Sequence, residues 1–209
     1  TIGGTPRQVT SGAHDHAGTM AWSKNAQQLI ISANTRDEAE FDMLNSDLFS
    51  IDINTLKVTK LTDMSGPEYS PQLSPNGKKI AFVGYEDNGK SNQLSQLYVM
   101  DSDGDNIKNL TSKLDRSVGA IKWADKGKGL YFSYDDMGKK NVAYVNLTGK
   151  ISNVTNDLGG TTLGRPYTSG DYDVTPKGHV VYTSSKGNRP ADLAVVTKKG
   201  KVKQSNLHL

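Results

Sequence analysis

The chain has 209 residues and no cysteine, which excludes disulfides and thiolate metal sites. Lysine and arginine exceed aspartate and glutamate by 25 to 22, a surplus too small to indicate nucleic-acid binding. No apolar run is long enough to span a bilayer, and 34% hydrophobic residues with a mean hydropathy of −0.58 suit sheets with polar edges. We therefore expect neither a nucleic-acid nor a membrane partner.

The first ten residues, TIGGTPRQVT, end in a Val-Thr pair that marks a repeat. Related pairs follow at Leu61-Thr62, Leu110-Thr111 and Val154-Thr155, so the spacing is about 44 to 52 residues. This period is typical of propeller blades. Residues 1–10 match only the end of one repeat, and we expect them to form the outer strand of a preceding blade.

Three further landmarks recur in register with these pairs. The first turns lie at 24–26, 75–77, 125–127 and 176–178; the second strands read QQLIISA, KKIAFVG, KGLYFSY and GHVVYTS; the third strands read DLFSIDI, QLYVMD, NVAYVNL and DLAVVT. The agreement predicts an all-β fold, a β-propeller segment of about four four-stranded blades in one partial domain. The expected blades are 18–62, 63–111, 112–155 and 156–209. The alternative is a β-sandwich whose strands resemble one another by accident.

Two segments near the start of the chain carry groups that bind ligands in other proteins. His14 and His16 would point to one side of an extended segment, but neither a third histidine nor a cysteine lies nearby in sequence, so we expect a polar loop and no metal. The loop at 35–47 has helix-forming composition, with Thr35 and Glu38 at capping-box spacing, and predicts a short helix. Its exposed carboxylates are either solvated charges or an acidic patch that captures a substrate amine.

Residues 84–91, GYEDNGKS, satisfy the phosphate-loop expression, yet they lead toward the strand QLYVMD. Phosphate loops work by leading into a helix whose amide groups cradle the phosphates. We therefore expect no nucleotide and no other cofactor. Trp22 and Trp123 hold the same place on two first strands and are expected in the core.

The second repeat, with SPNGKKIAF and LYVMDSDGDNIKNLT, resembles the propeller repeat shared by TolB periplasmic proteins and by the N-terminal domains of prolyl oligopeptidase-type serine peptidases. LDRSVGAIKW at 114–123, LGRPYTSGDYDV at 163–174 and NRPADLAVV at 188–196 are similar to acylaminoacyl-peptidase-like and dipeptidyl-peptidase-like members. The resemblance implies a propeller over an α/β-hydrolase domain that follows it in sequence. The absence of cysteine fits the periplasm and the cytoplasm of a bacterium equally.

The sequence departs from that family where the chemistry is concerned. The nucleophile motif G-x-S-x-G occurs nowhere in the 209 residues, so we expect no catalytic residue in this chain and no activity of the chain alone. The dipeptidyl-peptidase branch binds the substrate amine with two adjacent glutamates. Here Glu38 and Glu40, the candidates for amine capture, are separated by Ala39.

The resemblance favours a propeller that admits short peptides to the active site of a serine peptidase. The alternative is a TolB-like module that binds proteins or peptides without an enzyme. LGRPYTSG joins two blades, and we expect Arg165, Pro166 and Tyr167 on the face that meets the hydrolase domain or the substrate path. Arg165 has the alternative role of holding its own loop.

Stopping after about four blades should leave the two outer faces bare, which predicts self-association through the end blades. The side chains expected on these faces are Leu29, Ile31, Leu48, Phe49 and Ile51 in the first blade and Val180, Tyr182, Leu193 and Val195 in the last.

Overall fold

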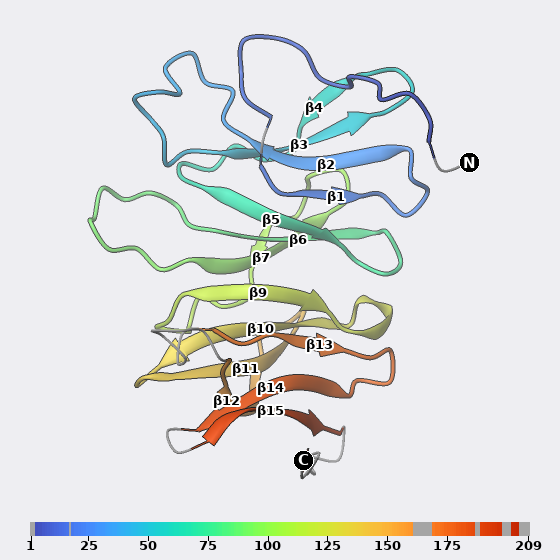
Figure 1. Cartoon of the computed structure of the whole chain (residues 1–209). Coiled ribbons are helices and arrows are strands. Elements are labelled where there is room, and N and C mark those ends of the chain that lie inside the picture. Colours follow the sequence, from blue (N-terminus) through green and yellow to red (C-terminus); the bar gives the residue numbers. More distant parts are fainter. Residues whose placement is uncertain (1–2, 17, 161–168, 187–188, 198–201, 205–209) are drawn as a thin grey trace. The chain divides into compact units, whose positions relative to one another are not determined.

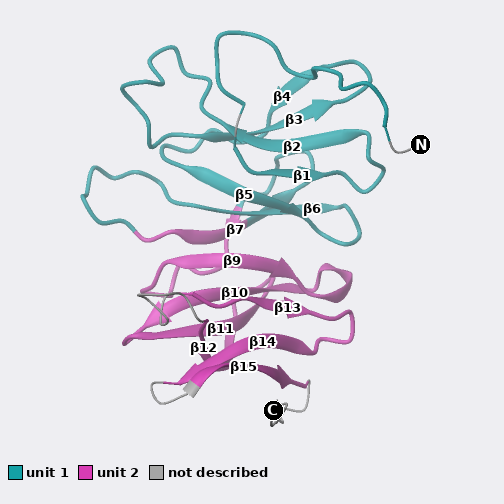
Figure 2. Cartoon of the chain, in the orientation of Figure 1, with its two compact units in different colours: residues 1–93, 99–107 teal, residues 94–98, 108–209 magenta. Residues whose placement is uncertain are grey.

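The computed structural model describes residues 3–16, 18–160, 169–186, 189–197 and 202–204. These residues form sixteen strands and one short 3₁₀ turn at Asp125–Gly127 (Figure 1). The chain divides into two compact units, residues 1–93 with 99–107 and residues 94–98 with 108–209 (Figure 2). None of the described residues belongs to a helix long and apolar enough to cross a membrane.

Two four-stranded sheets lie in the first half of the chain. The first has the order β1-β2-β3-β4, and its strands are β1 (Met20–Trp22), β2 (Gln28–Ala33), β3 (Asp47–Asp52) and β4 (Val58–Lys60). The second has the order β5-β6-β7-β8, and its strands are β5 (Glu68–Leu73), β6 (Lys79–Gly84), β7 (Gln96–Asp101) and β8 (Lys108–Asn109). The phosphate-loop pattern begins in β6 and leads toward the strand β7, as its sequence context predicted.

The second half of the chain forms two more blades, joined edge to edge. The third blade consists of β9 (Val118–Trp123), β10 (Gly129–Asp136), β11 (Lys139–Asn146) and β12 (Ile151–Leu158). The fourth consists of β13 (Tyr172–Val174), β14 (Val180–Lys186), β15 (Arg189–Val196) and β16 (Val202–Gln204). One bridge, Leu158 to Ser184, connects β12 to β14. The prediction of an all-β propeller segment of four four-stranded blades is confirmed; the residue bounds of the blades and the single partial domain stay predictions.

The closing Leu-Thr pairs have a common physical basis in the first two blades. The Leu61 amide donates to the Leu48 carbonyl at 2.8 Å, and the Leu48 amide donates to the Thr62 hydroxyl oxygen at 2.8 Å. In the second blade, the Leu97 amide donates to the hydroxyl oxygen of Thr111 at 2.9 Å. The threonine thus supplies an acceptor for a buried amide just beyond the last residue of the outer strand.

Two predicted elements are absent from the described residues. Residues 3–16 carry no strand, and their contact with the first blade includes a hydrogen bond from Arg7 to the Ile53 carbonyl. A strand requires a partner strand for its amides and carbonyls, and no described strand pairs with this segment. The loop at 35–47 contains turns in place of the predicted helix. A single turn gains too few hydrogen bonds to offset the cost of helix nucleation.

The outer faces differ from the prediction that they would be bare. Leu29, Ile31, Leu48, Phe49 and Ile51 are at most 9% exposed. Cross-strand neighbours cover one another, since β2 and β3 pair Leu29 with Ile51 and Ile31 with Phe49. Some exposed apolar groups lie instead on the edge strand β1, where Trp22 is 55% exposed, contrary to its predicted core position, and Met20 is 61% exposed.

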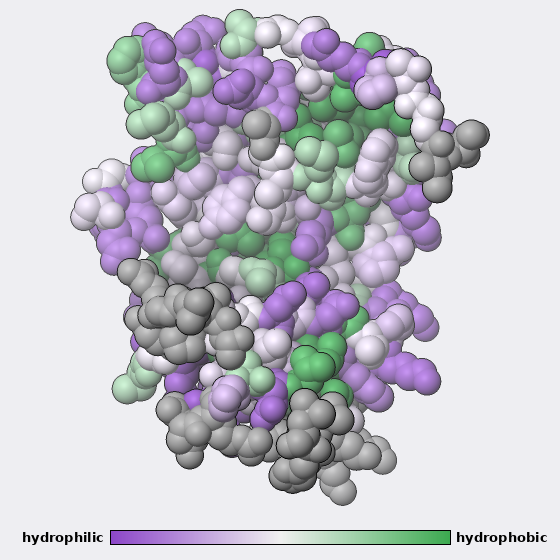
Figure 3. Space-filling model, in the orientation of Figure 1, coloured by the Kyte–Doolittle hydropathy of each residue, from purple (hydrophilic) through white to green (hydrophobic). Residues whose placement is uncertain are grey.

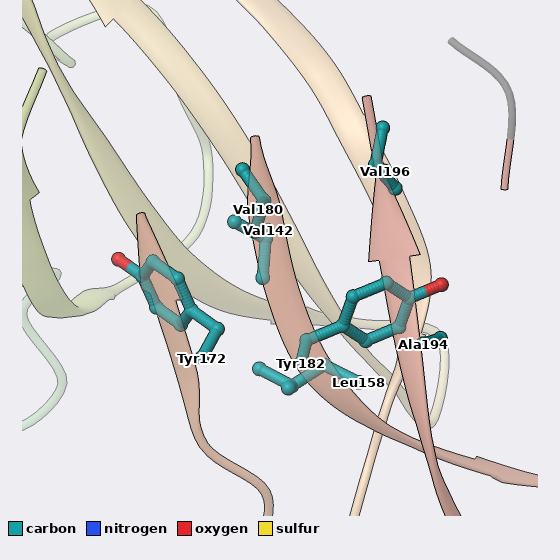
Figure 4. Packing of buried hydrophobic residues seen from close by; sticks show 7 residues of the cluster. All are labelled: Val142, Leu158, Tyr172, Val180, Tyr182, Ala194 and Val196. Carbon is teal, nitrogen blue, oxygen red and sulfur yellow. The ribbon is translucent and has the colours of Figure 1, made fainter. Parts of the chain in front are cut away.

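The core of the second unit lies where the third and fourth blades pack (Figure 4). Its buried residues come from β11 to β15 and are Val142, Leu158, Tyr172, Val180, Tyr182, Ala194 and Val196. Val180 and Tyr182, expected to be bare, are buried here, whereas Leu193 is 59% exposed and Val195 is half-buried.

A β-bulge recurs on two first strands. Ser70 in β5 and Ala120 in β9 have φ of 55° and 41°, at points where the register with the next strand shifts. The Ser70 amide donates to the Thr19 hydroxyl at 2.7 Å in the first unit, and the Ala120 carbonyl accepts from the Tyr172 hydroxyl in the second. The bulges therefore turn backbone groups toward an adjacent blade.

Replacing Thr111 by valine tests the closing threonine. Thr111→Val keeps the side-chain shape but removes the acceptor of the buried Leu97 amide. We expect the free energy of unfolding, measured by urea denaturation, to fall by about 1 to 3 kcal/mol. Thr59→Val, on the exposed face of β4, is the control and should change it by less than about 0.5 kcal/mol. Equal stability of Thr111→Val and the unaltered chain would contradict this role.

Candidate functional site

The loop between β2 and β3, residues 34–46, is fixed at its base by polar side chains. The Asn34 amide side chain donates to the Asp42 carbonyl at 2.8 Å, and its oxygen accepts the Arg36 amide at 3.3 Å. The Arg36 guanidinium group donates to the Asp42 carboxylate at 3.3 Å. The loop therefore has a defined conformation without a helix.

The tip of this loop exposes apolar side chains to solvent. Phe41, Met43 and Leu44 are 81%, 82% and 68% exposed. The carboxylates of Glu38 and Glu40 are exposed on the turn that precedes Phe41. Hydrophilic and apolar groups lie side by side on this part of the surface, at the upper left of Figure 3. Exposed apolar groups on an anchored loop are typical of a binding surface.

Beneath the loop, Asp47 begins β3 as a buried carboxylate. Its side chain is 2% exposed and forms ion pairs with Lys60 at 3.1 Å and with Arg36 at 3.7 Å. Burial alone would lower the pKa of Lys60, but hydrogen bonds to Asp63 and Asp47 outweigh burial and raise it. The ion pairs tie the β2–β3 loop to β4.

Two acceptor atoms in this region have no hydrogen-bond partner in the described structure. They are Oδ1 of Asp47 and Oδ1 of Asn45. Buried acceptors are normally satisfied, so an ordered water or a bound donor is expected at each of them.

Glu68, the first residue of β5, is fully buried next to this cluster. Its carboxylate accepts hydrogen bonds from the Thr62 hydroxyl and, at 3.2 Å, from the Met64 amide. Burial raises the pKa of Glu68 to about 7; the charge of Asp47 acts in the same direction, and the hydrogen bond from Thr62 opposes it.

The backbone of Glu68 also forms hydrogen bonds. Its carbonyl accepts from the hydroxyls of Ser32 at 2.5 Å and Ser46 at 3.0 Å. Glu68 thus joins the first and second blades inside the first unit.

The residues predicted from sequence fall in different places. Glu38 and Glu40 lie at the exposed tip, as their composition suggested, whereas Arg165, Pro166 and Tyr167 lie outside the described residues. His14 and His16 line a shallow polar pocket with Gln8 and Thr10, among others. No group of three histidine, cysteine, aspartate or glutamate residues suited to a metal ion occurs in the described part of the chain.

Sequence reasoning missed the buried pair Asp47 and Glu68. One signal was available, because Glu68 follows the closing threonine Thr62 by six residues and begins a first strand, which packs inside its blade. An acidic residue at a position expected to be buried is informative, since such groups are almost never buried without partners.

The comparisons with known sequences agree on the fold. The family model described as the TolB beta propeller domain matches residues 1–208. The chain is 27% identical to dipeptidyl-peptidase 5 of Porphyromonas gingivalis over 153 residues, which is 72% of this chain and 22% of that protein. It is 26% identical to the Tol-Pal system protein TolB of Francisella tularensis over 135 residues, which is 63% of this chain and 28% of that protein. The chain thus spans about a quarter of the length of these relatives.

Solved structures of similar fold have several different functions. The match to oligogalacturonate lyase from Vibrio parahaemolyticus has a TM-score of 0.68 at 15% identity, covering 93% of this chain and 55% of that one. The match to the acylaminoacyl peptidase of Pyrococcus horikoshii has a TM-score of 0.63 at 18% identity, covering 89% of this chain and 26% of that one. At these identities the likeness establishes the fold alone.

The raised pKa of Glu68 predicts a stability that decreases as pH rises. Between pH 4.5, the ordinary pKa of a glutamate, and about pH 7, Glu68 keeps its proton in the folded chain but has released it in the unfolded chain. The free energy of unfolding should therefore fall by about 2 to 3 kcal/mol from pH 5 to pH 8, as measured by urea denaturation. Glu68→Gln mimics the protonated form and should remove most of this loss. Glu86 is exposed, and Glu86→Gln is the control that should show the same loss of stability as the unaltered chain. An unchanged pH dependence in Glu68→Gln would disprove the raised pKa of Glu68.

Proposed function

The chain belongs to the TolB β-propeller family, and from this we propose that it is the propeller module of a serine peptidase. Its role is to restrict access to an α/β-hydrolase domain of the same polypeptide. The observation that carries the proposal is the match to a dipeptidyl-peptidase over 72% of the chain, compared with 63% for the TolB relative. In this proposal the 209 residues are part of a longer polypeptide, called the longer protein below, and the hydrolase domain lies in that polypeptide outside these residues.

The physical basis of the proposed role is exclusion by size. A folded protein cannot pass an entrance that admits an extended peptide, so selection precedes any recognition of side chains. The propeller needs no catalytic residue for this role. It needs blades that stay closed, and the threonine closures and the buried Glu68 joint support that requirement.

The β2–β3 loop has the groups to bind a peptide that approaches the propeller. The exposed carboxylates of Glu38 and Glu40 can pair with a substrate amine, and Phe41 offers an apolar surface beside them. The ion pairs of Arg36 and Asp47 hold the base of the loop, which lowers the entropy lost when a ligand binds to its tip.

The proposal also assigns roles to residues 165–167. Arg165, Pro166 and Tyr167 are candidates for the substrate path or for the interface with the hydrolase domain, where an arginine pairs well with a carboxylate.

Self-association through the end blades is part of the same proposal and rests on the exposed Leu193 and Trp22. Light scattering that finds a strict monomer at micromolar concentration would exclude self-association.

A TolB-like binding module is the second candidate. The exposed Phe41, Met43 and Leu44 favour it, because they form an apolar surface that suits a protein or peptide partner without any chemistry. The two candidates differ in whether the longer protein contains an activated serine.

Labelling with a fluorophosphonate, which reacts with activated serines, separates the candidates. We expect the longer protein to be labelled and to hydrolyse dipeptidyl or acyl-peptide chromogenic substrates, and we expect the 209-residue chain to do neither. A longer protein that is folded but neither labelled nor active would favour the TolB-like module. Serine-dependent hydrolysis by the 209-residue chain would overturn both candidates.

Arg165→Ala in the longer protein tests the proposed interface. Loss of a guanidinium group that contacts the substrate should raise KM for peptides several-fold with kcat unchanged. Loss of a contact between domains should instead lower Tm without a selective change in KM. Lys90→Ala, on the exposed β6–β7 loop, is a control of the same charge. Unchanged kinetics together with unchanged Tm would exclude both roles.

A further inference from the structure

A cavity of about 660 Å³ lies between the third and fourth blades, within the second unit. The turn from β9 to β10, residues 124–128, forms one side, and the turn from β13 to β14, residues 176–178, forms the other. Val154, Val180 and Val196 supply apolar wall. The volume is in the range of small-molecule sites, about 300 to 1,000 Å³.

The rim of the cavity is positively charged. Lys126, Lys128 and Lys177 line it, and Asp125 is the one acidic residue among the lining side chains. None of the three ammonium groups forms an ion pair with a described residue. Three unpaired cations around one cavity create a potential that favours an anion.

Two tyrosines form the aromatic part of the lining. The rings of Tyr131 and Tyr144 are 5.2 Å apart between centroids and tilted by 59°. The Tyr144 hydroxyl donates to the Lys128 carbonyl at 3.2 Å, which fixes its ring beside the charged turn. Burial raises the pKa of both tyrosines, so both hydroxyls stay neutral and able to donate hydrogen bonds.

The repeat provides an internal control for this cavity. Between the corresponding turns of the first and second blades lies a smaller cavity of about 510 Å³, within the first unit. Its turns carry Asn25 and Asn76, which accept hydrogen bonds from the amides of Gln27 and Lys78. Lysine cannot accept such a bond, so the requirements of the turn do not explain Lys126 and Lys177 at the same positions.

The tyrosine pair is also specific to the third blade. The equivalents of Tyr131 and Tyr144 in the first blade are Ile30 and Ser50, which pair in the same register. Gly129 makes room for Tyr144, because a Cβ there would collide with the Val145 carbonyl and with the Tyr144 hydroxyl. The equivalent positions of the first and second blades hold Gln28 and Lys79. The departures from the repeat thus gather around one cavity.

We propose that this cavity binds a small organic anion, with its carboxylate or phosphate group at the lysines and a ring-sized apolar body against the tyrosine pair. Lysine ammonium groups and the Tyr131 hydroxyl supply donors to the oxyanion, while the valines and tyrosine rings cover the apolar body. The site is independent of the proposed peptidase role, because it uses neither the β2–β3 loop nor residues 165–167.

Isothermal titration calorimetry of the full 209-residue chain with benzoate and with phenyl phosphate tests the proposal. We expect saturable binding of at least one probe at millimolar concentration or below, weakened by added salt because the lysines are exposed. Benzyl alcohol, which lacks the charge, and inorganic phosphate, which lacks the ring, should bind at least about fivefold more weakly. The order of the two probes identifies the natural group, carboxylate or phosphate, and either order supports the site.

Matched variants locate the binding. The double variant Lys126→Gln/Lys177→Gln should weaken the tighter probe by about fivefold to twentyfold, since each exposed charge contributes a factor of up to about five. Tyr131→Phe should weaken it with the fold intact, by circular dichroism. Lys24→Gln, at the smaller cavity of the first unit, should leave binding unchanged. No saturable binding of either probe, or equal weakening by Lys24→Gln and the double variant, would overturn the proposal.

Discussion

A hydrogen bond from a backbone amide to a threonine hydroxyl closes each of the first two blades, and the links that these blades make depend on it. The outer strands are short, two or three residues, and leave an amide of the third strand without a backbone acceptor. Thr62 and Thr111 supply that acceptor inside the protein, where an unpaired amide is costly. Each threonine hydroxyl also donates a hydrogen bond. The position of the group that accepts this bond determines whether the blade is linked to a neighbouring blade.

The two recipients have different consequences. Thr62 donates to Glu68 on the first strand of the next blade, whereas Thr111 donates to Gln96 on the third strand of its own blade, at 3.0 Å. The Thr62–Glu68 bond connects the closure of the first blade to the second blade through a titratable carboxyl group. The Thr111–Gln96 bond stays within the second blade. The repeated Leu-Thr pair thus forms the same amide-to-hydroxyl bond in both blades, but its hydroxyl donates to different partners.

The sequence predicted the blades because their determinants are local. Alternating strands, turns at fixed offsets and the closing threonine all lie within one repeat, so four copies reinforce one interpretation. The failures concern features that depend on other parts of the chain. The strand expected at residues 1–10 has no described partner, and Trp22 is exposed because its strand lies at an edge of its sheet.

The candidate site was predictable only in part, for the same reason. Glu38 and Glu40 could be placed on an exposed loop from composition. The pairing of Asp47 with Lys60 and the burial of Glu68 follow from how β3, β4 and β5 come together, which no local pattern encodes. The loop forms turns in place of a helix, and the Asn34 side chain occupies the Asp42 carbonyl that a longer helix would use.

The spacing of the closing bonds has a consequence for folding kinetics. Thr62 and Thr111 each lie 14 residues from the amide they accept. Among the bonds that join blades, Thr62 to Glu68 spans only six residues, whereas Ser32 to Glu68 spans 36 and Ala120 to Tyr172 spans 52. Closing a short loop costs less chain entropy than closing a long one. We therefore expect the blade closures and the Thr62–Glu68 bond to form early, and the bonds from Ser32 to Glu68 and from Tyr172 to Ala120 to form later.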